Sequence, residues 1–397
     1  MTRTHLPTIA FPIFALSCAA ALPAQSYVDL LDSRNAVHPY ASVLEIEAGA
    51  IGTLAEDSDA AALDIGLDDD ISWDGHVYYR NESKGATGNT WQAYGGRDGL
   101  FASYTDGKLI GDETLTRFEV HARPWQFYRD GFYEGGDLQK NGFYDGEDYE
   151  GYVGFGREAQ QGLFIEMGPF YKTLDFKRSK LTGDPSVFTI PDGYDAYGGR
   201  LYVEQNTIQL DRRRGTPRDG YSLTLIGERE WNDSRGEFGR TSLFTTELPS
   251  AVWRLRGRFE WYIPASDSTA WEVFANGGWQ DEKDRVQNSE AQRPLGHQWA
   301  DAQLRLRMSL GQSLTLTPFF NGQYSRVLNE DGGSSSRDFF IGGGAEVWYH
   351  FGETVSMHGF YSYLDNDNRP SILIDEDVHG EHMFYLGFVV RFGTSRR

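Results

Sequence analysis

The chain has almost no cysteine, and that shortage limits its chemistry. Cys18 is the only cysteine among 397 residues, and it lies in an apolar run close to the N-terminus. We expect that run to be removed on export, which leaves no disulfide, cysteine-based metal site or thiol nucleophile in the mature chain. The sequence before Cys18 is a poor lipobox, so lipid attachment is the lesser alternative.

Long apolar runs and positive charge are scarce as well. Beyond the N-terminus, no stretch approaches the roughly 18 consecutive apolar residues of a transmembrane helix. Lysine and arginine number 37 against 58 aspartate and glutamate residues, so the formal net charge is -21. The sequence shows no basic surface for a nucleic acid, no glycine-rich phosphate loop and no zinc-ligand spacing. No nucleic-acid partner and no cofactor are therefore expected.

The N-terminus predicts an exported protein. Arg3 and His5 precede an apolar run, and small residues follow it, as in a secretory signal peptide. We expect the signal to occupy residues 1–24, with cleavage between Ala21 and Ser26. A buried N-terminal helix is the alternative interpretation of the same run.

Aromatic residues, glycine and two-faced segments are abundant. Only 39% of the chain is hydrophobic and the mean hydropathy is -0.52, yet 14% of the residues are aromatic and 46 are glycine. In VWRLRGRFEWYIP and in ADAQLRLRMSL, large apolar residues alternate with polar ones, which is the period of a β-strand. These segments run about 10 to 13 residues, whereas soluble strands average about five or six and membrane-spanning strands need about nine to eleven.

The connections between these segments alternate between short and long. Tight turns are expected at PASDS, GQS and GET, and long polar links at residues 232–250, 281–298, 327–337 and 366–380. Outer-membrane barrels combine tight periplasmic turns with long external loops, whereas a soluble β-sandwich has no reason to keep every second link short. The sequence therefore predicts an all-β fold, a transmembrane antiparallel β-barrel of about 16 strands over residues 42–397, after a short periplasmic segment at 25–41.

Counting back from the C-terminus gives the individual strands. The clearer half has strands at 381–392, 355–365, 338–351, 313–326, 299–310, 269–280, 252–263 and 221–231. The less regular half has strands at 194–209, 161–176, 148–157, 125–136, 112–123, 97–106, 71–82 and 42–53. An even number leaves both termini in the periplasm, and 14 is the alternative because residues 84–110 are difficult to divide. Interfacial aromatic girdles are expected from Trp253, Trp261, Trp279, Trp299 and Trp348.

One stretch, YVEQNTIQLDRRRGTPRDGYSLTLIGEREW, carries more than alternation. From Asn206 through Asp211 to Pro217 and Gly220 it resembles a turn in barrels of the BamA outer-membrane assembly factor superfamily, or bacterial surface antigen family. There, an Asn/Asp-rich strand end precedes a Pro-x-x-Gly hairpin turn. Later features are similar in order: strands ending in WYIP and near GGWQ, a long loop, and FGE before the penultimate strand. The resemblance covers residues 112–397.

The resemblance implies a sixteen-stranded barrel in the bacterial outer membrane that acts in protein insertion or translocation. It also implies contact with outer-membrane lipids, and with the barrel-assembly machinery during biogenesis. Two parts of that machinery do not match. Residues 27–41 leave no room for a POTRA module, and DEKDRVQNSEAQRPLGHQ replaces the Val-Arg-Gly-Phe motif of the sixth external loop. A passive pore or structural barrel is therefore the alternative, and a periplasmic partner of unknown identity would favour the first function.

No catalytic site is expected. The histidines that could serve a phospholipase-type barrel lack a serine two residues on: His121, His350 and His358. An omptin-type arrangement could combine Asp377 and His379 with the acids at 68–70, but a chain with this many acidic residues produces such pairs by chance. LDNDNRP lacks the glycine and closing glutamate of a calcium loop, which leaves weak divalent-cation binding by the external loops as an alternative.

Two strands carry a set of charged residues expected to line the lumen: Arg254, Arg256, Arg258, Glu260, Arg305 and Arg307. In the structural interpretation, the arginines pair with inward acids such as Glu260, Asp301 and Glu346 and hold the shape of the barrel. In the functional interpretation they line an aqueous path.

The closing strand, EHMFYLGFVVRF, has one face made of large hydrophobic residues. Tyr385, Gly387, Val390 and Phe392 match the spacing of the carboxy-terminal signal by which outer-membrane barrels are received for insertion. That signal usually ends at the final aromatic residue, whereas GTSRR follows Phe392 here.

Overall fold

The computed structural model describes most of the chain. The described residues are 33–34, 40–58, 71–82, 89–96, 99–111, 114–124, 133–134, 137–138, 145–178, 188–210, 216–240, 244–280, 296–327, 336–352, 354–365, 369–370 and 377–395. Within these ranges, no helix has the length and apolar character needed to cross a membrane. The predicted signal, residues 1–24, lies outside them.

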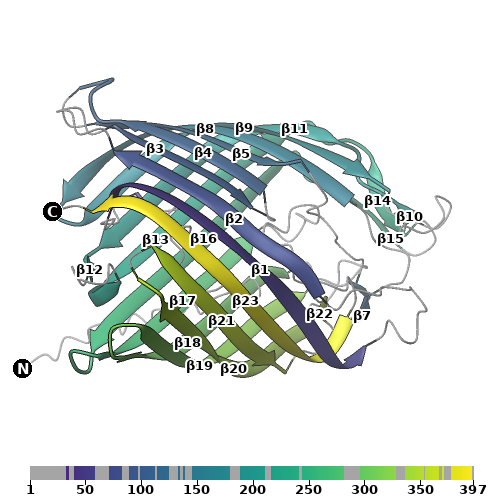
Figure 1. Ribbon diagram of the computed structural model, residues 1–397. Coiled ribbons are helices and arrows are strands. Elements are labelled where there is room, and N and C mark those ends of the chain that lie inside the picture. The colour runs from purple at the N-terminus through teal and green to yellow at the C-terminus, as the bar shows by residue number, and fades with distance from the viewer. Residues whose placement is uncertain are drawn as a thin grey trace, which may run out of the picture.

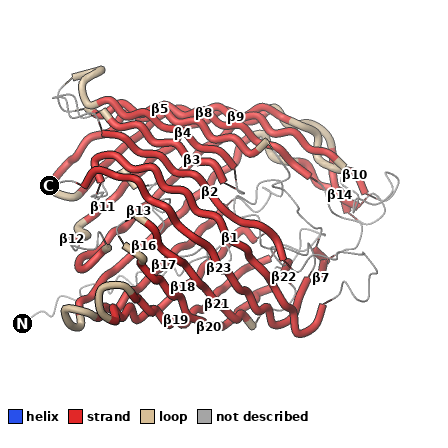
Figure 2. The backbone as a smooth tube through the Cα atoms, in the orientation of Figure 1, coloured by secondary structure: helices blue, strands red, loops and turns tan. Residues whose placement is uncertain are grey.

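Sixteen strands form the wall of a closed antiparallel barrel (Figures 1 and 2). They are β1 (Tyr40–Ser58), β2 (Ile71–Glu82), β3 (Thr90–Gly96), β4 (Gly99–Asp106), β5 (Leu115–Arg123), β8 (Asp145–Gln160), β9 (Leu163–Lys177), β11 (Tyr194–Asn206), β13 (Pro217–Asn232), β16 (Ala251–Pro264), β17 (Thr269–Gln280), β18 (Gly296–Leu310), β19 (Leu314–Val327), β20 (Ser336–His350), β21 (Val355–Leu364) and β23 (Asp377–Ser395). Each strand pairs with the one before and the one after it, which satisfies the backbone without water. The predicted fold class and strand number are confirmed.

The barrel closes where β1 pairs with β23, and we call this junction the seam. Its register runs from Tyr40 opposite Ser395 to Ser58 opposite Val378. β23 also pairs with β21, so it is bonded on both sides. In Figure 1 the two strands, purple and yellow, run side by side across the front of the barrel. The start of β1 and the end of β23 therefore lie at the same end of the barrel.

Alternation gives the wall two chemically different faces. On β16, Trp253, Leu255 and Trp261 are exposed on the outside, whereas Arg254 is buried on the inside. β23 likewise exposes Phe388 and the other large residues of its even-numbered face. An apolar outside around a charged interior is the pattern of a barrel whose outer surface meets lipid.

The connections differ between the two ends of the barrel. At the end where β1 begins, β8 and β9 are joined by residues 161–162, β16 and β17 by 265–268, and β18 and β19 by 311–313. We call this the short-turn end. The opposite, long-loop end includes the links 124–144 and 281–295. Two links depart from the alternation: only residues 97–98 join β3 to β4 at the long-loop end, and the ten residues 207–216 join β11 to β13 at the short-turn end.

The first half of the chain departs from the sequence prediction at two strands. The prediction of a wall strand at 125–136 is wrong, because β5 pairs directly with β8 and leaves no place for a strand between them. Only Pro124 would have separated that strand from β5, and a hairpin turn needs about two residues. Tyr133–Glu134 (β6) pairs instead with Asp137–Leu138 (β7) in a separate hairpin, and residues 125–132 lie outside the described part. The prediction also lacks β3, which is seven residues long.

Two of the five tryptophans assigned to the girdle face the lumen instead. Trp299 shares its face with Asp301 and covers Gly278, where an added Cβ would lie 2.4 Å from the indole ring. Trp348 stacks on His358 with ring centroids 4.1 Å apart. Both tryptophans belong to the polar face of their strand by alternation. Alternation therefore predicts the side on which they lie better than nearness to a strand end does. Trp253, Trp261 and Trp279 are exposed on the outside.

Smaller strands occur at both ends of the barrel. At the short-turn end, β12 (Gln209–Leu210) pairs with the beginning of β13, and Gly220 there has a φ of 98°. Its Cβ would also lie 2.3 Å from the Thr207 carbonyl oxygen, so this turn requires glycine. Strands at the long-loop end are β22 (Arg369–Pro370) and the three-stranded sheet of β10 (Phe188–Thr189), β14 (Glu237–Arg240) and β15 (Phe244–Glu247).

Candidate functional site: the ion-paired lumen wall

Arginines on β16 meet carboxylates of the neighbouring strand β13. Arg254 Nη1 lies 2.6 Å from Glu230 Oε2, and Arg256 Nη2 lies 3.2 Å from Glu228 Oε1. Glu228 is opposite Arg254 in register, so each pair is diagonal across the two strands. The glutamates were absent from the expected partners, because only the strand register shows that they share a face with the arginines.

Each of these glutamates serves a second cation from the other side of β13. Glu230 lies 2.7 Å from Lys172 Nζ on β9, and Glu228 lies 2.6 Å from Arg200 Nε on β11. Arg200 reaches further, to Glu150 on β8 at 2.6 Å. Charges on five neighbouring strands are therefore linked into one buried network.

The remaining predicted lumen residues form a separate pair on β16 and a second network on β17, β18 and β20. Arg258 pairs along its own strand with Glu260 at 2.7 Å. On β18, Arg305 bonds to Glu346 and lies 3.3 Å from Glu272, which is also 3.1 Å from Arg307. Glu260 and Glu346, two of the three acids expected as partners, thus meet arginines of the set.

Buried polar contacts also cross the seam. Arg391 of β23 bonds to Glu45 of β1, and Tyr385 of β23 donates its hydroxyl to Glu47 of β1 over 2.7 Å. His358 of β21 lies 3.1 Å from Glu47 and 3.4 Å from Glu346. Separating β1 from β23 would take the β23 partners away from the buried carboxylates of Glu45 and Glu47, both on β1, at a cost of about 1–3 kcal/mol for each buried group left unpaired.

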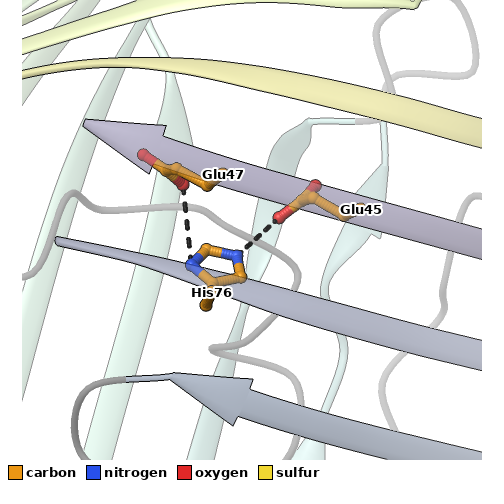
Figure 3. A group of neighbouring side chains, drawn as sticks. All are labelled: Glu45, Glu47 and His76. Carbon is orange, nitrogen blue, oxygen red and sulfur yellow. Dashed lines mark hydrogen bonds and ion pairs between the residues drawn. The ribbon is translucent and has the colours of Figure 1, made fainter.

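Glu45, Glu47 and His76 are the group of potential metal ligands found among the described residues (Figure 3). His76 projects from β2 between the two carboxylates of β1. Its Nε2 lies 3.2 Å from Glu45, and its Nδ1 lies 3.8 Å from Glu47. The two ring nitrogens thus face different carboxylates, while a metal ion binds through one nitrogen of the ring. The geometry suits a histidine that bridges two carboxylates better than a metal centre.

The inner wall also binds a piece of the chain that precedes the barrel. Arg34 places its guanidinium 3.0 Å from Glu119 on β5 and 3.2 Å from Glu166 on β9. Its backbone N–H donates to Glu204 on β11 over 2.6 Å, and its Cζ lies 4.6 Å from the centre of the Tyr202 ring. We call Glu119, Glu166, Tyr202 and Glu204 the arginine cage.

The position of the arginine cage is informative. Two of its three strands, β9 and β11, are the seventh and eighth of the sixteen wall strands and lie nearly opposite β1, which the chain enters at Tyr40 only six residues after Arg34. Glu166 and Glu204 are close to the short-turn ends of their strands. No sequence pattern predicts this contact, because a lone arginine before the first strand belongs to no motif.

Residues considered for catalysis do not assemble into an accessible site among the described side chains. His350 Nδ1 lies 2.7 Å from Ser356 Oγ, a cross-strand contact that a search along the sequence does not reveal. Ser356 is buried, however, so its hydroxyl is closed to a substrate. The side chains of Asp377 and His379, the acids at 68–70 and residues 366–368 of LDNDNRP lie outside the described part.

The four residues expected to form an insertion signal lie on both faces of β23. Phe392 is exposed on the outside, on the same face as Val390. Tyr385 is buried on the inside, and its ring lies over Gly387, where a Cβ would come within 2.2 Å of the tyrosine oxygen. The strand continues past Phe392 as far as Ser395, which pairs with Tyr40.

Comparisons with known proteins bear on the fold. No family model matches the sequence, and no curated protein matches it significantly. Among solved structures, BamA from Haemophilus ducreyi lacking POTRA domains 1–3 is similar, with a TM-score of 0.50 and 11% sequence identity over 88% of this chain and 70% of that chain. CdiB from Acinetobacter baumannii has a TM-score of 0.48 and 8% identity over 88% of this chain and 60% of that chain. At 11% identity the likeness to BamA concerns the fold alone, and by fold this chain is a closed sixteen-stranded barrel of the BamA type.

Proposed function

We propose that the chain is a bacterial outer-membrane protein that translocates polypeptide through its lumen. The aromatic and aliphatic side chains exposed around the outer wall support the membrane location. Short turns are periplasmic in such barrels, so the short-turn end, where β1 begins and β23 ends, is assigned to the periplasm. The BamA-type resemblance of the sequence implies insertion or translocation of proteins, and the fold agrees with that class.

The observation that carries this proposal is the polypeptide bound to the inner wall. Arg34 and Ser33 engage the wall through a guanidinium, a backbone N–H and a hydroxyl, and each donates to a carboxylate. A polypeptide that moves along a wall of paired charges can form a new ion pair as it breaks an old one. Its charged side chains therefore need not become buried without a partner. Insertion through the seam is less favoured, because the seam is closed by a long ladder and by buried side-chain bonds.

A passive pore is the second candidate, and the lumen wall also favours it. Rings and stripes of charged side chains line aqueous pores and set their ion selectivity. The networks around Arg200 and Arg305 would provide such a lining without any polypeptide substrate.

Planar-bilayer recording of the purified barrel separates the two candidates. The probe is an unstructured, arginine-containing peptide added to the side that holds the short-turn end. Translocation predicts transient blockades whose frequency rises with peptide concentration and whose duration depends on voltage. A steady conductance that the peptide leaves unchanged would exclude polypeptide translocation and favour the passive pore.

A disulfide across the seam tests the route. Ala48 and Phe388 are opposite each other on β1 and β23, so Ala48→Cys with Phe388→Cys can lock the two strands. We expect the oxidised barrel to keep the peptide blockades, because the lumen does not need the seam to open. Loss of blockades on oxidation, with recovery on reduction, would assign the route to the seam instead.

A further inference from the structure

Arg229 on β13 points to the outer face of the wall. Glu228 and Glu230 of β13 face the lumen, so Arg229 between them points outward and is partly exposed. It lies three residues before Asn232, where β13 ends at the long-loop end. Trp231 and Trp253, on the same face, are exposed. Because tryptophans gather at the membrane interface, this level of the wall corresponds to the lipid headgroups.

Aromatic rings hold the guanidinium of Arg229. Its Cζ lies 4.8 Å from the centre of the Trp253 ring and 5.6 Å from that of Trp231. Tyr197 stacks on Trp231 with ring centroids 6.0 Å apart and extends the aromatic surface. Stacking fixes the plane of a guanidinium while leaving its N–H groups directed along that plane, where they can donate to another group.

No carboxylate among the described residues lies within ion-pair distance of Arg229, whose contacts there are the two rings. The neighbouring Arg254 and Arg256, on the inward face, are both paired with glutamates. A planar cation with five donors and no anion beside it is suited to bind a phosphate from outside the protein.

Two glycines lie on the outer face of the wall, one beside Arg229 and one on its membrane-centre side. Gly199 on β11 is opposite Arg229, and Gly227 on β13 precedes Arg229 by two residues, toward the short-turn end. An added Cβ at either glycine would meet nothing within 4 Å. Leu201 and Leu255 flank Gly227 in register on its two sides. The outer surface therefore has an apolar recess that starts below the guanidinium.

We propose that Arg229, Trp231 and Trp253 bind the phosphate of an anionic membrane lipid in the leaflet at the long-loop end. One acyl chain of that lipid lies over Gly227, between Leu201 and Leu255. The phosphate supplies the anion that the guanidinium lacks, and the indole rings pack against the glycerol and the upper chain. This site is on the outside of the barrel and does not depend on what passes through the lumen.

Native mass spectrometry of the refolded barrel in detergent tests the proposal. The probe is dioleoylphosphatidylglycerol, and dioleoylglycerol, with the same chains and no phosphate, is its control. Arg229→Ala should weaken binding of the phospholipid about tenfold, equivalent to about 1.4 kcal/mol, and leave binding of the neutral lipid unchanged. Trp253→Leu should weaken phospholipid binding by less, because the charge remains.

Arg157→Ala is the matched control variant. Arg157 is also an exposed arginine on the outer face, but it lies near the short-turn end of β8. We expect it to bind the phospholipid as the wild type does. Equal binding by Arg229→Ala and wild type, or an equal loss in Arg157→Ala, would overturn the proposal. Heat-modifiable gel mobility verifies that each variant is folded before its binding is compared.

Discussion

At the scale of single residues, carboxylates are the branch points of the lumen networks. Glu230 binds both Lys172 and Arg254, and Glu272 lies between Arg305 and Arg307. Removing one cation leaves such a carboxylate with its other partner. Removing the carboxylate takes one partner from two buried cations at once. The glutamates should therefore matter more to stability than the arginines around them.

Glu230→Gln tests this asymmetry. Breaking a buried ion pair from one side costs about 3–5 kcal/mol, and this substitution weakens two such pairs. We expect Lys172→Gln to cost clearly less, because Glu230 keeps Arg254 at 2.6 Å. Urea unfolding of the barrel in lipid vesicles gives the free energy of unfolding of each variant. Equal losses for the two substitutions would mean that the carboxylate is not the branch point.

Arg34→Ala should release the segment that precedes the barrel from the arginine cage. With Ser33→Cys as a reporter, a membrane-impermeant maleimide should label the thiol slowly when Arg34 is present and rapidly when it is not, because Ser33 is held against Glu204. Arg218→Ala is the control, since Arg218 is an exposed cation at the same end of the barrel. Labelling that is equally rapid with and without Arg34 would show that the segment is not docked in solution.

At the scale of elements, the strands differ in how far the sequence predicts them. The sequence predicts a strand at residues 269–280, which is β17, because Trp271, Val273 and Trp279 share one face and Glu272, Asn276 and Gln280 share the other. β3 has no such signal, since its seven residues end in two glycines and a two-residue link leads straight into β4. The aromatic-rich stretch 125–136 imitates a strand, and only the direct pairing of β5 with β8 excludes it from the wall.

The closing strand is the element on which barrel formation depends most. β23 pairs with both β1 and β21, so deletion from Phe384 onward would leave two unsatisfied edges in the hydrocarbon layer. We expect this truncation, and Phe392→Asp, to give an exported chain that is not inserted and is degraded. Cell fractionation and heat-modifiable gel mobility report insertion. Normal insertion of the truncated chain would contradict this account of β23.

A shorter truncation separates the role of the end of β23 in strand pairing from its role as an insertion signal. Removing residues 393–397 deletes only the pairs that Gly393, Thr394 and Ser395 make with the first residues of β1. The outward hydrophobic residues up to Phe392 remain. We expect insertion to persist with some loss of stability, because the seam still pairs over most of its length. If this truncation blocked insertion, the insertion signal would have to include residues beyond Phe392.

At the scale of the whole molecule, closure brings together residues that the sequence keeps far apart. Glu47 meets His358, and Arg34 meets Glu204, only because sixteen strands return to their starting point. Local patterns predicted which face of a strand is charged, and so located Arg254 and Arg305. They could not predict the partner of each charge, because register and closure are properties of the complete ring.

The orientation of the whole barrel is the last prediction. Outer-membrane barrels have short turns on the periplasmic side and longer loops on the external side. An epitope inserted at Asn288 or Gly332, in long links, should be reached by antibody on intact cells. An epitope inserted at Ser266 or Gln312, in turns at the short-turn end, should be reached only after the outer membrane is opened. Ser266 and Gln312 lie on separate turns, so a local distortion at one would not mislead both. The reverse pattern at all four positions would put both termini on the outside and move the Arg229 site to the inner leaflet.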